Sequence, residues 1–208
     1  MKLDVLSING KSTGRSIDLP ENIFGLEKND HLLYLAVKQY LAAQRQGTHK
    51  AKEKGEVKAS TRKIKKQKGT GTARFGDIKN PIFRGGGRMF GPRPRNYTIK
   101  LNKKVKRLAR NSVLSSKMTE GKVMVVENQS FDAPKTKSFI EIMNGLEVNG
   151  QKALFVVGDH DQNLYLSSRN VPKANVMRVQ DLNTYQIMNA NTILFFENSV
   201  DKMKEVFA

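Results

Sequence analysis

Residues 122–157 read KVMVVENQSFDAPKTKSFIEIMNGLEVNGQKALFVV, and this stretch decides the fold class. Its two ends, Lys122–Glu127 and Ala153–Val157, are short and nearly continuous apolar runs, a pattern typical of strands that are buried on both faces. Between them, residues 134–146 place four apolar side chains on one helical face, namely Phe139, Ile142, Met143 and Leu146. A buried strand, a helix and a second buried strand, in this order, predict a parallel βαβ unit.

The same alternation continues toward the C-terminus. The expected elements are a helix at Leu164–Arg169, a strand at Asn175–Val179, a helix at Asp181–Met188, a strand at Thr192–Glu197 and a final helix that Ser199 caps and that runs through Val206. This order of elements predicts one three-layer α/β domain over residues 1–208, with a mostly parallel sheet flanked by helices.

The N-terminal part predicts a hairpin and a long helix, and a second long helix follows further on. Lys2–Ile8 alternates as a strand, Asn9-Gly10 is a turn signal, and Arg15–Leu19 can pair back. The first helix begins at Asn29 or Asp30, is expected to stop by Gly47, and has an apolar side made of Leu32, Leu33, Leu35, Ala36, Val37, Tyr40 and Leu41. The second is opened by Asn102, is closed by Gly121, and points Val105, Leu108, Ala109 and Val113 inward.

The charge of the chain is concentrated in one third of its length. The 208 residues carry 37 Lys and Arg against 19 Asp and Glu, for a formal net charge of +18. Residues 44–112 hold 22 of the basic residues and only three acids, Glu53, Glu56 and Asp77, so the rest of the chain is close to neutral. This asymmetry is typical of a nucleic-acid-binding segment on an ordinary globular body.

Composition also excludes several classes of protein. The chain has no cysteine, which excludes disulfides and thiolate metal sites. Its N-terminus lacks the apolar run of a secretory signal, and its longest apolar runs are too short to span a bilayer. We expect a soluble, cytoplasmic protein that binds no membrane, needs no cofactor or metal and forms no homo-oligomer.

Residues 45–100 form an insertion between the two long helices, without helical or strand periodicity. Cations are interleaved with glycines in Lys68–Arg74 and Arg84–Arg88, and backbone N–H groups beside glycine can approach phosphates closely. Rings on which unpaired RNA bases can stack recur at Phe75, Phe83, Phe90 and Tyr97. Pro92–Arg95 stiffens the chain before a helix whose basic face suits a duplex backbone. We interpret the insertion as a long, extended, basic internal loop that binds RNA.

Four motifs of this region together resemble the extended loop of the L-four family of large-subunit ribosomal proteins. They are Arg45-Gln46-Gly47-Thr48, Gln67-Lys68-Gly69-Thr70-Gly71 with Ala73-Arg74, Arg84-Gly85-Gly86-Gly87 with Phe90-Gly91-Pro92, and Asn102-Lys103-Lys104-Val105. Ala133-Pro134-Lys135-Thr136-Lys137 also looks like the family's pattern, so the resemblance covers essentially the whole chain.

The resemblance implies a structural, non-enzymatic constituent of the large ribosomal subunit, which binds large-subunit rRNA and neighbouring ribosomal proteins. It implies a globular α/β domain on the outer surface of the subunit and a loop, here residues 45–100, that penetrates the rRNA. It also implies that the loop tip helps form the wall of the peptide exit tunnel, near the nascent peptide and the macrolide-binding region. By motif, the tip here is Gln67, Lys68, Gly69, Thr70 and Gly71.

Composition and resemblance together select the residues that we expect to bind rRNA. They are Arg45, Thr48, His49, Lys50, Arg62, Lys63, Lys65, Lys66, Gln67, Lys68, Gly69, Thr70, Gly71, Arg74, Phe75, Arg84, Gly85, Gly86, Gly87, Arg88, Phe90, Arg93, Arg95 and Tyr97 in the insertion, and Lys103, Lys104, Arg107 and Arg110 in the following helix.

The main alternative is an RNA-binding enzyme or regulator with a nucleotide-binding-like α/β body. Yet Arg74 stands where the G-x-G-x-x-G fingerprint begun by Gly69 and Gly71 needs a glycine, and neither a P-loop nor a G-x-S-x-G motif occurs. Asp159-His160-Asp161 could ligate a metal or serve acid–base chemistry, but a turn followed by a helix that Asp161 begins explains it without a site. Composition does not separate DNA from RNA, and only the resemblance favours RNA.

Overall fold

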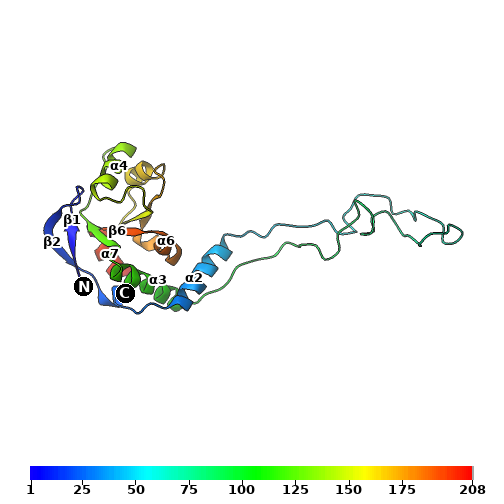
Figure 1. The fold of residues 1–208 in the computed structure, drawn as a ribbon, viewed down its shortest axis with the longest axis horizontal. Coiled ribbons are helices and arrows are strands. Elements are labelled where there is room, and N and C mark those ends of the chain that lie inside the picture. The colour runs from blue at the N-terminus through cyan, green and yellow to red at the C-terminus, as the bar shows by residue number, and fades with distance from the viewer. Residues whose placement is uncertain (208) are drawn as a thin grey trace. The chain divides into compact units, whose positions relative to one another are not determined.

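The structure is a computed structural model that describes residues 1–207. It divides into two compact units. The α/β unit comprises Met1–Leu41 and the chain from Lys100 onward, and the basic unit comprises Ala42–Ile99. All helices and strands described here belong to the α/β unit, except that one helix ends two residues inside the basic unit (Figure 1).

The helices and strands largely follow the predicted alternation. In chain order they are β1 (Lys2–Leu6), β2 (Ser12–Asp18), α1 (Glu21–Phe24), α2 (Asp30–Ala43), α3 (Lys103–Thr119), β3 (Val123–Val126), α4 (Thr136–Gly145), β4 (Ala153–Val157), α5 (Gln162–Ser168), β5 (Ala174–Arg178), the 3₁₀ turn η1 (Val179–Asp181), α6 (Thr184–Asn189), β6 (Thr192–Phe196) and α7 (Glu197–Phe207).

The strands form one mixed sheet of six strands in the order β2-β1-β3-β6-β4-β5. Only the β1–β2 pair is antiparallel, with Lys2 opposite Asp18 in the predicted N-terminal hairpin. The pairs β1–β3, β3–β6, β6–β4 and β4–β5 are parallel. The prediction of an α/β fold with a mostly parallel sheet flanked by helices is therefore confirmed.

Strand β6 lies between β3 and β4, and all five of its residues are buried. Ile193 and Phe195 belong to a core cluster that also contains buried residues of α1, α2, α3, α6 and α7. Leu194 and Phe196 belong to a second cluster with residues of α4 and α5. Alternate side chains of a strand point to opposite faces, so β6 contributes to the core on both sides of the sheet. This arrangement gives the three layers: helices, sheet and helices.

The predicted inward face of α3 is partly wrong. Leu108 is 46% exposed, whereas the polar residues Asn111, Ser112 and Ser115 are buried. The Ser112 hydroxyl donates to the Glu27 carbonyl and accepts from the Asn29 N–H, and the Ser115 hydroxyl donates to the Ile23 carbonyl. Buried backbone groups need partners, so this polar face serves the backbone at 22–29, which comprises the end of α1 and the irregular chain before α2.

The short helix α1 was not predicted, although it matters to the core. Its Ile23 and Phe24 are buried, and the Phe24 ring meets Phe195 edge-on with 6.2 Å between centroids. A single turn of four residues has no helical periodicity that a sequence could display. Leu41, predicted on the apolar side of α2, is 44% exposed.

Two predicted helix starts near the C-terminus are also wrong. The final helix begins at Glu197 and not after Ser199, whose hydroxyl donates to the Phe196 carbonyl at 2.6 Å. Asp181 lies in η1, and α6 is capped instead by the Asn183 side chain, which accepts from the Gln186 N–H. Asp161 caps α5 as predicted, accepting from the Leu164 N–H at 3.1 Å.

The position of Phe195 makes its truncation a test of this core. We expect Phe195→Ala to lower the free energy of unfolding of the α/β unit by about 3–5 kcal/mol, because it leaves a cavity beside Phe24 in a site with no solvent access. Urea unfolding followed by circular dichroism measures this change. The matched control is Phe90→Ala, since Phe90 is fully exposed in the basic unit. A loss below about 1 kcal/mol for Phe195→Ala would contradict the packing described.

Candidate nucleic-acid interface

The basic unit contains no helix or strand beyond the end of α2, and backbone hydrogen bonds hold its two runs side by side (Figure 1). The Arg95 N–H donates to the Gly47 carbonyl at 3.1 Å, and the Ala51 N–H donates to the Pro92 carbonyl at 3.0 Å. The Arg88 N–H donates to the Lys52 carbonyl at 2.9 Å, and the Ile64 N–H donates to the Gly76 carbonyl at 3.1 Å. These bonds make the segment an irregular hairpin.

The hairpin register places the turn near Thr70. Ile64 and Gly76, the bonded pair nearest the turn, each lie six residues from Thr70. Lys65 Nζ donates to the Thr72 hydroxyl at 3.0 Å across the same region. Gly69 and Gly71 have positive φ angles of 80° and 62°, which glycine adopts without strain, and no atom lies within 4 Å of the Cβ position of either. The turn is therefore exposed and free of internal packing.

The acids of the basic unit are already neutralised within it. Glu56 pairs with Lys50, Glu53 with Arg93 at 2.6 Å, and Asp77 with Lys54 at 3.1 Å. The hydrogen bond from Lys50, together with the Glu53 N–H, lowers the pKa of Glu56, so this carboxylate stays ionised and paired. Residues 42–99 contain 16 Lys and Arg in all, and the other 13 form no ion pair with any residue among 1–207. Their charge is available to an external polyanion.

Tyr97 stabilises the base of the hairpin. The Arg45 guanidinium lies 3.7 Å from the centroid of the Tyr97 ring, and that of Arg95 lies 4.6 Å from it. The Tyr97 hydroxyl is 3.3 Å from His49 Nε2. These cation–π contacts link the outgoing and returning chain. Tyr97, predicted to contact rRNA, is thus half-buried among residues of its own unit.

Phe75 is likewise committed to an internal contact. Its ring packs on that of Phe83, with 5.3 Å between the ring centroids. Lys65 Nζ lies 5.5 Å from the centroid of the Phe75 ring. Phe83 belongs to a compact turn in which the Phe83 N–H donates to the Asn80 carbonyl and the Gly87 N–H donates to the Lys79 carbonyl. The pair Phe75–Phe83 therefore forms a small apolar contact inside the basic unit.

The glycines of the unit serve two different purposes. A Cβ on Gly87 would lie 2.5 Å from Lys54 Cα and 2.8 Å from the Glu53 carbonyl carbon, and one on Gly86 would meet the Asn80 carbonyl. These two glycines let the chain pack on itself. Around Gly69, Gly71 and Gly85 the Cβ position is open, so those glycines leave the backbone accessible to a ligand.

In the α/β unit, the predicted basic face of α3 is exposed at Lys103, Lys104 and Arg107. Arg110 differs, because its guanidinium lies 3.5 Å from the centroid of the Phe207 ring in α7. Burial lowers the pKa of Arg110 to about 10, with a smaller effect of Arg107, so the group remains a cation at neutral pH. Arg110 therefore holds α7 against α3, whereas the exposed cations of α3, which also include Lys106, are available to RNA.

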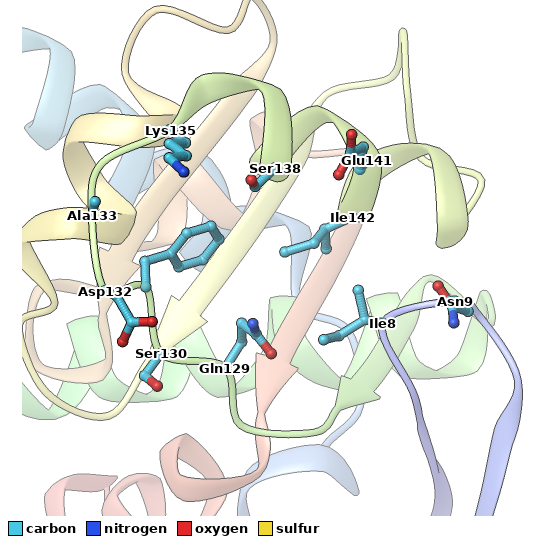
Figure 2. Close-up of a pocket in the computed structure, with 11 residues that line it drawn as sticks. Ile8, Asn9, Gln129, Ser130, Asp132, Ala133, Lys135, Ser138, Glu141 and Ile142 are labelled. Atoms are coloured by element: carbon cyan, nitrogen blue, oxygen red, sulfur yellow. The ribbon is translucent and has the colours of Figure 1, made fainter.

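The α/β unit contains a pocket that bears on the enzymatic alternative. The pocket has a volume of about 380 Å³. It lies between the β1–β2 turn, the β3–α4 loop and α4, and its lining includes both acidic and basic residues, namely Asp132, Glu141 and Lys135 (Figure 2). No histidine or cysteine lines it.

The residues Asp159-His160-Asp161 are explained by structural contacts. Asp159 pairs with Lys202, Asp161 caps α5, and the His160 ring lies 6.3 Å from that of Tyr165. Residues 1–207 contain no group of three or more potential ligands placed to hold a metal ion. In the same part of the chain, no helix is both long and apolar enough to cross a bilayer.

The chain is similar in sequence to known ribosomal proteins. A sequence model of the ribosomal protein L4/L1 family matches residues 17–206. The chain belongs to this family. A large ribosomal subunit protein uL4 from Christiangramia forsetii is 58% identical over 201 residues, which cover 97% of each chain. Proteins of the same description from Flavobacterium psychrophilum (57% over 205 residues, 99% of this chain and 98% of the relative) and Bacteroides thetaiotaomicron (50% over 206 residues, 99% of each) match similarly.

Most of the residues predicted to bind rRNA are exposed. All of the predicted residues are exposed except Phe75, Gly86, Gly87, Tyr97 and Arg110, which contact their own chain. Lys52 and Lys58 were not in the predicted set, although both are exposed cations of the basic unit without an acidic partner among residues 1–207. They lie outside the recognised motifs, and only the charge of the segment could have indicated them.

Two glycine substitutions separate internal packing from ligand access. We expect Gly87→Ala to weaken binding of the full chain to large-subunit rRNA about tenfold, because the new methyl group overlaps the backbone of Glu53 and Lys54 and forces the two runs apart. Gly76→Ala is the matched control, since no atom lies within 4 Å of its Cβ position. Filter binding measures both affinities. Equal affinities for the two variants would show that the packing at Gly87 does not form the interface.

Proposed function

We propose that residues 45–100 penetrate the folded rRNA of the large ribosomal subunit, and that Gln67–Gly71 contribute to the wall of the peptide exit tunnel beside the nascent peptide. The chain itself is a structural constituent of the large ribosomal subunit that binds rRNA and acts in translation, and it is not an enzyme. Its partners are rRNA and other ribosomal proteins, and it works in the cytoplasm as part of the subunit.

The charge of the basic unit carries the proposal for rRNA penetration. Thirteen cations without an acidic partner repel one another, and the acids of the chain do not relieve this repulsion. Phosphates that rRNA folding brings close together repel one another in the same way. Placing the hairpin among them neutralises both and releases condensed counterions, which favours the assembled state. The function of the segment is thus to stabilise packed RNA.

The exposed turn supports the proposal for the tunnel. Gln67–Gly71 is the part of the hairpin farthest along the chain from its base, and no side chain packs over Gly69 or Gly71. A turn built from glycine, threonine and two long polar side chains presents backbone and mobile polar groups, and it offers no deep apolar pocket that would bind a passing peptide. Such a surface suits the wall of a channel through which varied sequences pass.

Removing the hairpin tests the rRNA-binding role. The Gly47 carbonyl accepts from the Arg95 N–H, so the two ends are close enough to replace residues 48–96 by a short glycine linker. We expect the shortened chain to remain folded and to bind large-subunit rRNA at least about 100-fold more weakly. We also expect the affinity of the full chain to fall on the order of 10³-fold between 50 and 200 mM salt, and that of the shortened chain to change far less.

Circular dichroism and urea unfolding check that the shortened chain keeps its α/β unit. If the shortened chain binds rRNA as tightly and with the same salt dependence as the full chain, residues 48–96 are not the interface. If it unfolds, the hairpin is required for the fold of the α/β unit, which contradicts the division of roles.

The tunnel role is tested by photo-crosslinking in translating ribosomes. We expect a photoreactive residue at position 70 to label a radiolabelled nascent peptide of sufficient length. The same residue at position 78, where Ile78 is 48% exposed but lies away from the turn, is the control and should not label it. Labelling from position 78 but not from position 70 would exclude Gln67–Gly71 as the tunnel-facing segment.

A further inference from the structure

The aromatic residues of the basic unit differ in what already occupies their rings. Tyr97 is covered by the guanidinium groups of Arg45 and Arg95, and Phe75 packs on Phe83. Phe90 has none of these contacts and is 101% exposed, the full accessibility of an isolated side chain. A phenylalanine that makes no contact with its own chain leaves its whole apolar surface in water, which is unfavourable until a partner covers it.

The backbone holds Phe90 in a bulge. Ala51 and Lys52 are consecutive, yet their hydrogen-bond partners Pro92 and Arg88 are separated by three residues, Met89, Phe90 and Gly91. The hydrogen bonds on both sides, at 3.0 and 2.9 Å, therefore force these three residues out of the ladder. Gly91 closes the bulge, since a Cβ there would lie 2.6 Å from the Ala51 methyl carbon.

Phe90 also adopts an unusual backbone conformation. Its φ angle is +51°, in the left-handed region that a residue with a bulky side chain seldom enters. Elsewhere in residues 1–207 only Glu147 and Lys173, among residues other than glycine, have positive φ. Strain of this kind persists where the surrounding contacts impose it, and it is concentrated at sites that bind ligands. The strain and the exposure together indicate that the bulge presents this ring to a partner.

The surroundings of the bulge favour a nucleobase over an apolar protein pocket. Arg88 and Arg93 flank it in sequence, Arg84 and Arg95 lie a few residues further away, and of these four only Arg93 has an acidic partner within residues 1–207. Within two residues of Phe90 in the sequence, Met89 is the other exposed large hydrophobic residue, at 64%. A single exposed ring with arginines close to it in the sequence suits an unstacked base, which the π-face can bind while the cations bind adjacent phosphates.

We propose that Phe90 stacks on an unpaired base of the large-subunit rRNA, and that the Met89–Gly91 bulge exists to present it. This inference rests on the rRNA-binding function proposed above and makes it more specific. Phe90 recognises a single-stranded loop or bulge within the rRNA, while the cations bind the phosphates of any nearby strand. Stacking on a ring tolerates every base, so Phe90 selects an unpaired nucleotide and not a particular sequence.

Three substitutions in the full chain distinguish stacking from simple apolar contact. Phe90→Asn removes the ring and keeps a residue that tolerates positive φ, Phe90→Leu keeps apolar surface without a π-face, and Phe90→Trp keeps a π-face. The probe is deproteinised large-subunit rRNA folded in Mg²⁺. We expect Phe90→Asn and Phe90→Leu to weaken binding by about 5- to 100-fold and Phe90→Trp to retain affinity within about threefold. The salt dependence should be unchanged in all three, because no phosphate contact is lost.

Ile82→Asn is the matched control, since Ile82 is 71% exposed in the same unit but has no ring. The affinity of this variant for rRNA should stay within about twofold of the wild-type value. Ultraviolet crosslinking of the wild-type complex, followed by mass spectrometry, should join the peptide that contains Phe90 to a nucleotide that is unpaired in the folded rRNA.

The outcomes separate this inference from the proposed function. If wild-type chain fails to bind rRNA, the proposed function itself is wrong. If wild-type chain binds and Phe90→Asn binds equally well, Phe90 does not stack on RNA. Two outcomes would instead identify an apolar protein pocket as the partner and overturn the inference. In the first, Phe90→Asn lowers the affinity but Phe90→Leu keeps that of the wild-type chain. In the second, Phe90→Asn lowers the affinity only for particles that contain other ribosomal proteins.

Discussion

The charge of residues 42–99 is the constraint on which the organisation of this protein depends. Sixteen cations and three acids cannot be packed around an apolar core, because desolvating them without partners is too costly. The segment is therefore held by contacts that tolerate water: four long-range backbone hydrogen bonds, three ion pairs and the guanidinium groups over Tyr97. Such contacts define a register but leave nearly every cation exposed. The same property that prevents a core supports the proposal that the segment binds the phosphates of rRNA.

The α/β unit is built on the opposite principle. Its central strand β6 is buried on both faces, and two separate apolar clusters cover the sheet. The long helix α3 uses buried hydroxyl groups of Ser112 and Ser115 to satisfy backbone groups of α1 and of the irregular chain that connects α1 to α2. Helix α3 also contacts α7, because the Arg110 guanidinium lies over the ring of Phe207. The unit is thus held together by apolar packing and internal polar contacts, and it carries only a small part of the chain's excess positive charge.

Within the basic unit, glycine and aromatic residues divide between internal structure and external contact. Gly86 and Gly87 permit the chain to pack on itself, whereas Gly69 and Gly71 leave open space around the turn. Phe75 and Tyr97 are occupied by neighbours, whereas Phe90 is not. Residues of the same type, glycine or aromatic, therefore have different roles at different positions of the segment. The difference arises from the hydrogen-bond register, which pairs Lys52 with Arg88 and Ala51 with Pro92 and so leaves residues 89–91 outside the ladder.

The sequence by itself determined the fold class, the location of the basic segment and the family. Apolar runs such as Ala153–Val157 are read directly as buried strands because burial on both faces requires a continuous apolar segment, and net charge is a sum over residues that needs no coordinates. Only the tertiary structure decided which side chains of these elements are free. Asn111, Ser112 and Ser115 are buried because they are partners for the backbone at 22–29, whereas Leu108, one turn earlier on the same helical face, is exposed, and no hydrophobic pattern encodes either outcome. Phe90 is free and Phe75 is not because irregular pairing between distant residues leaves no period in the sequence.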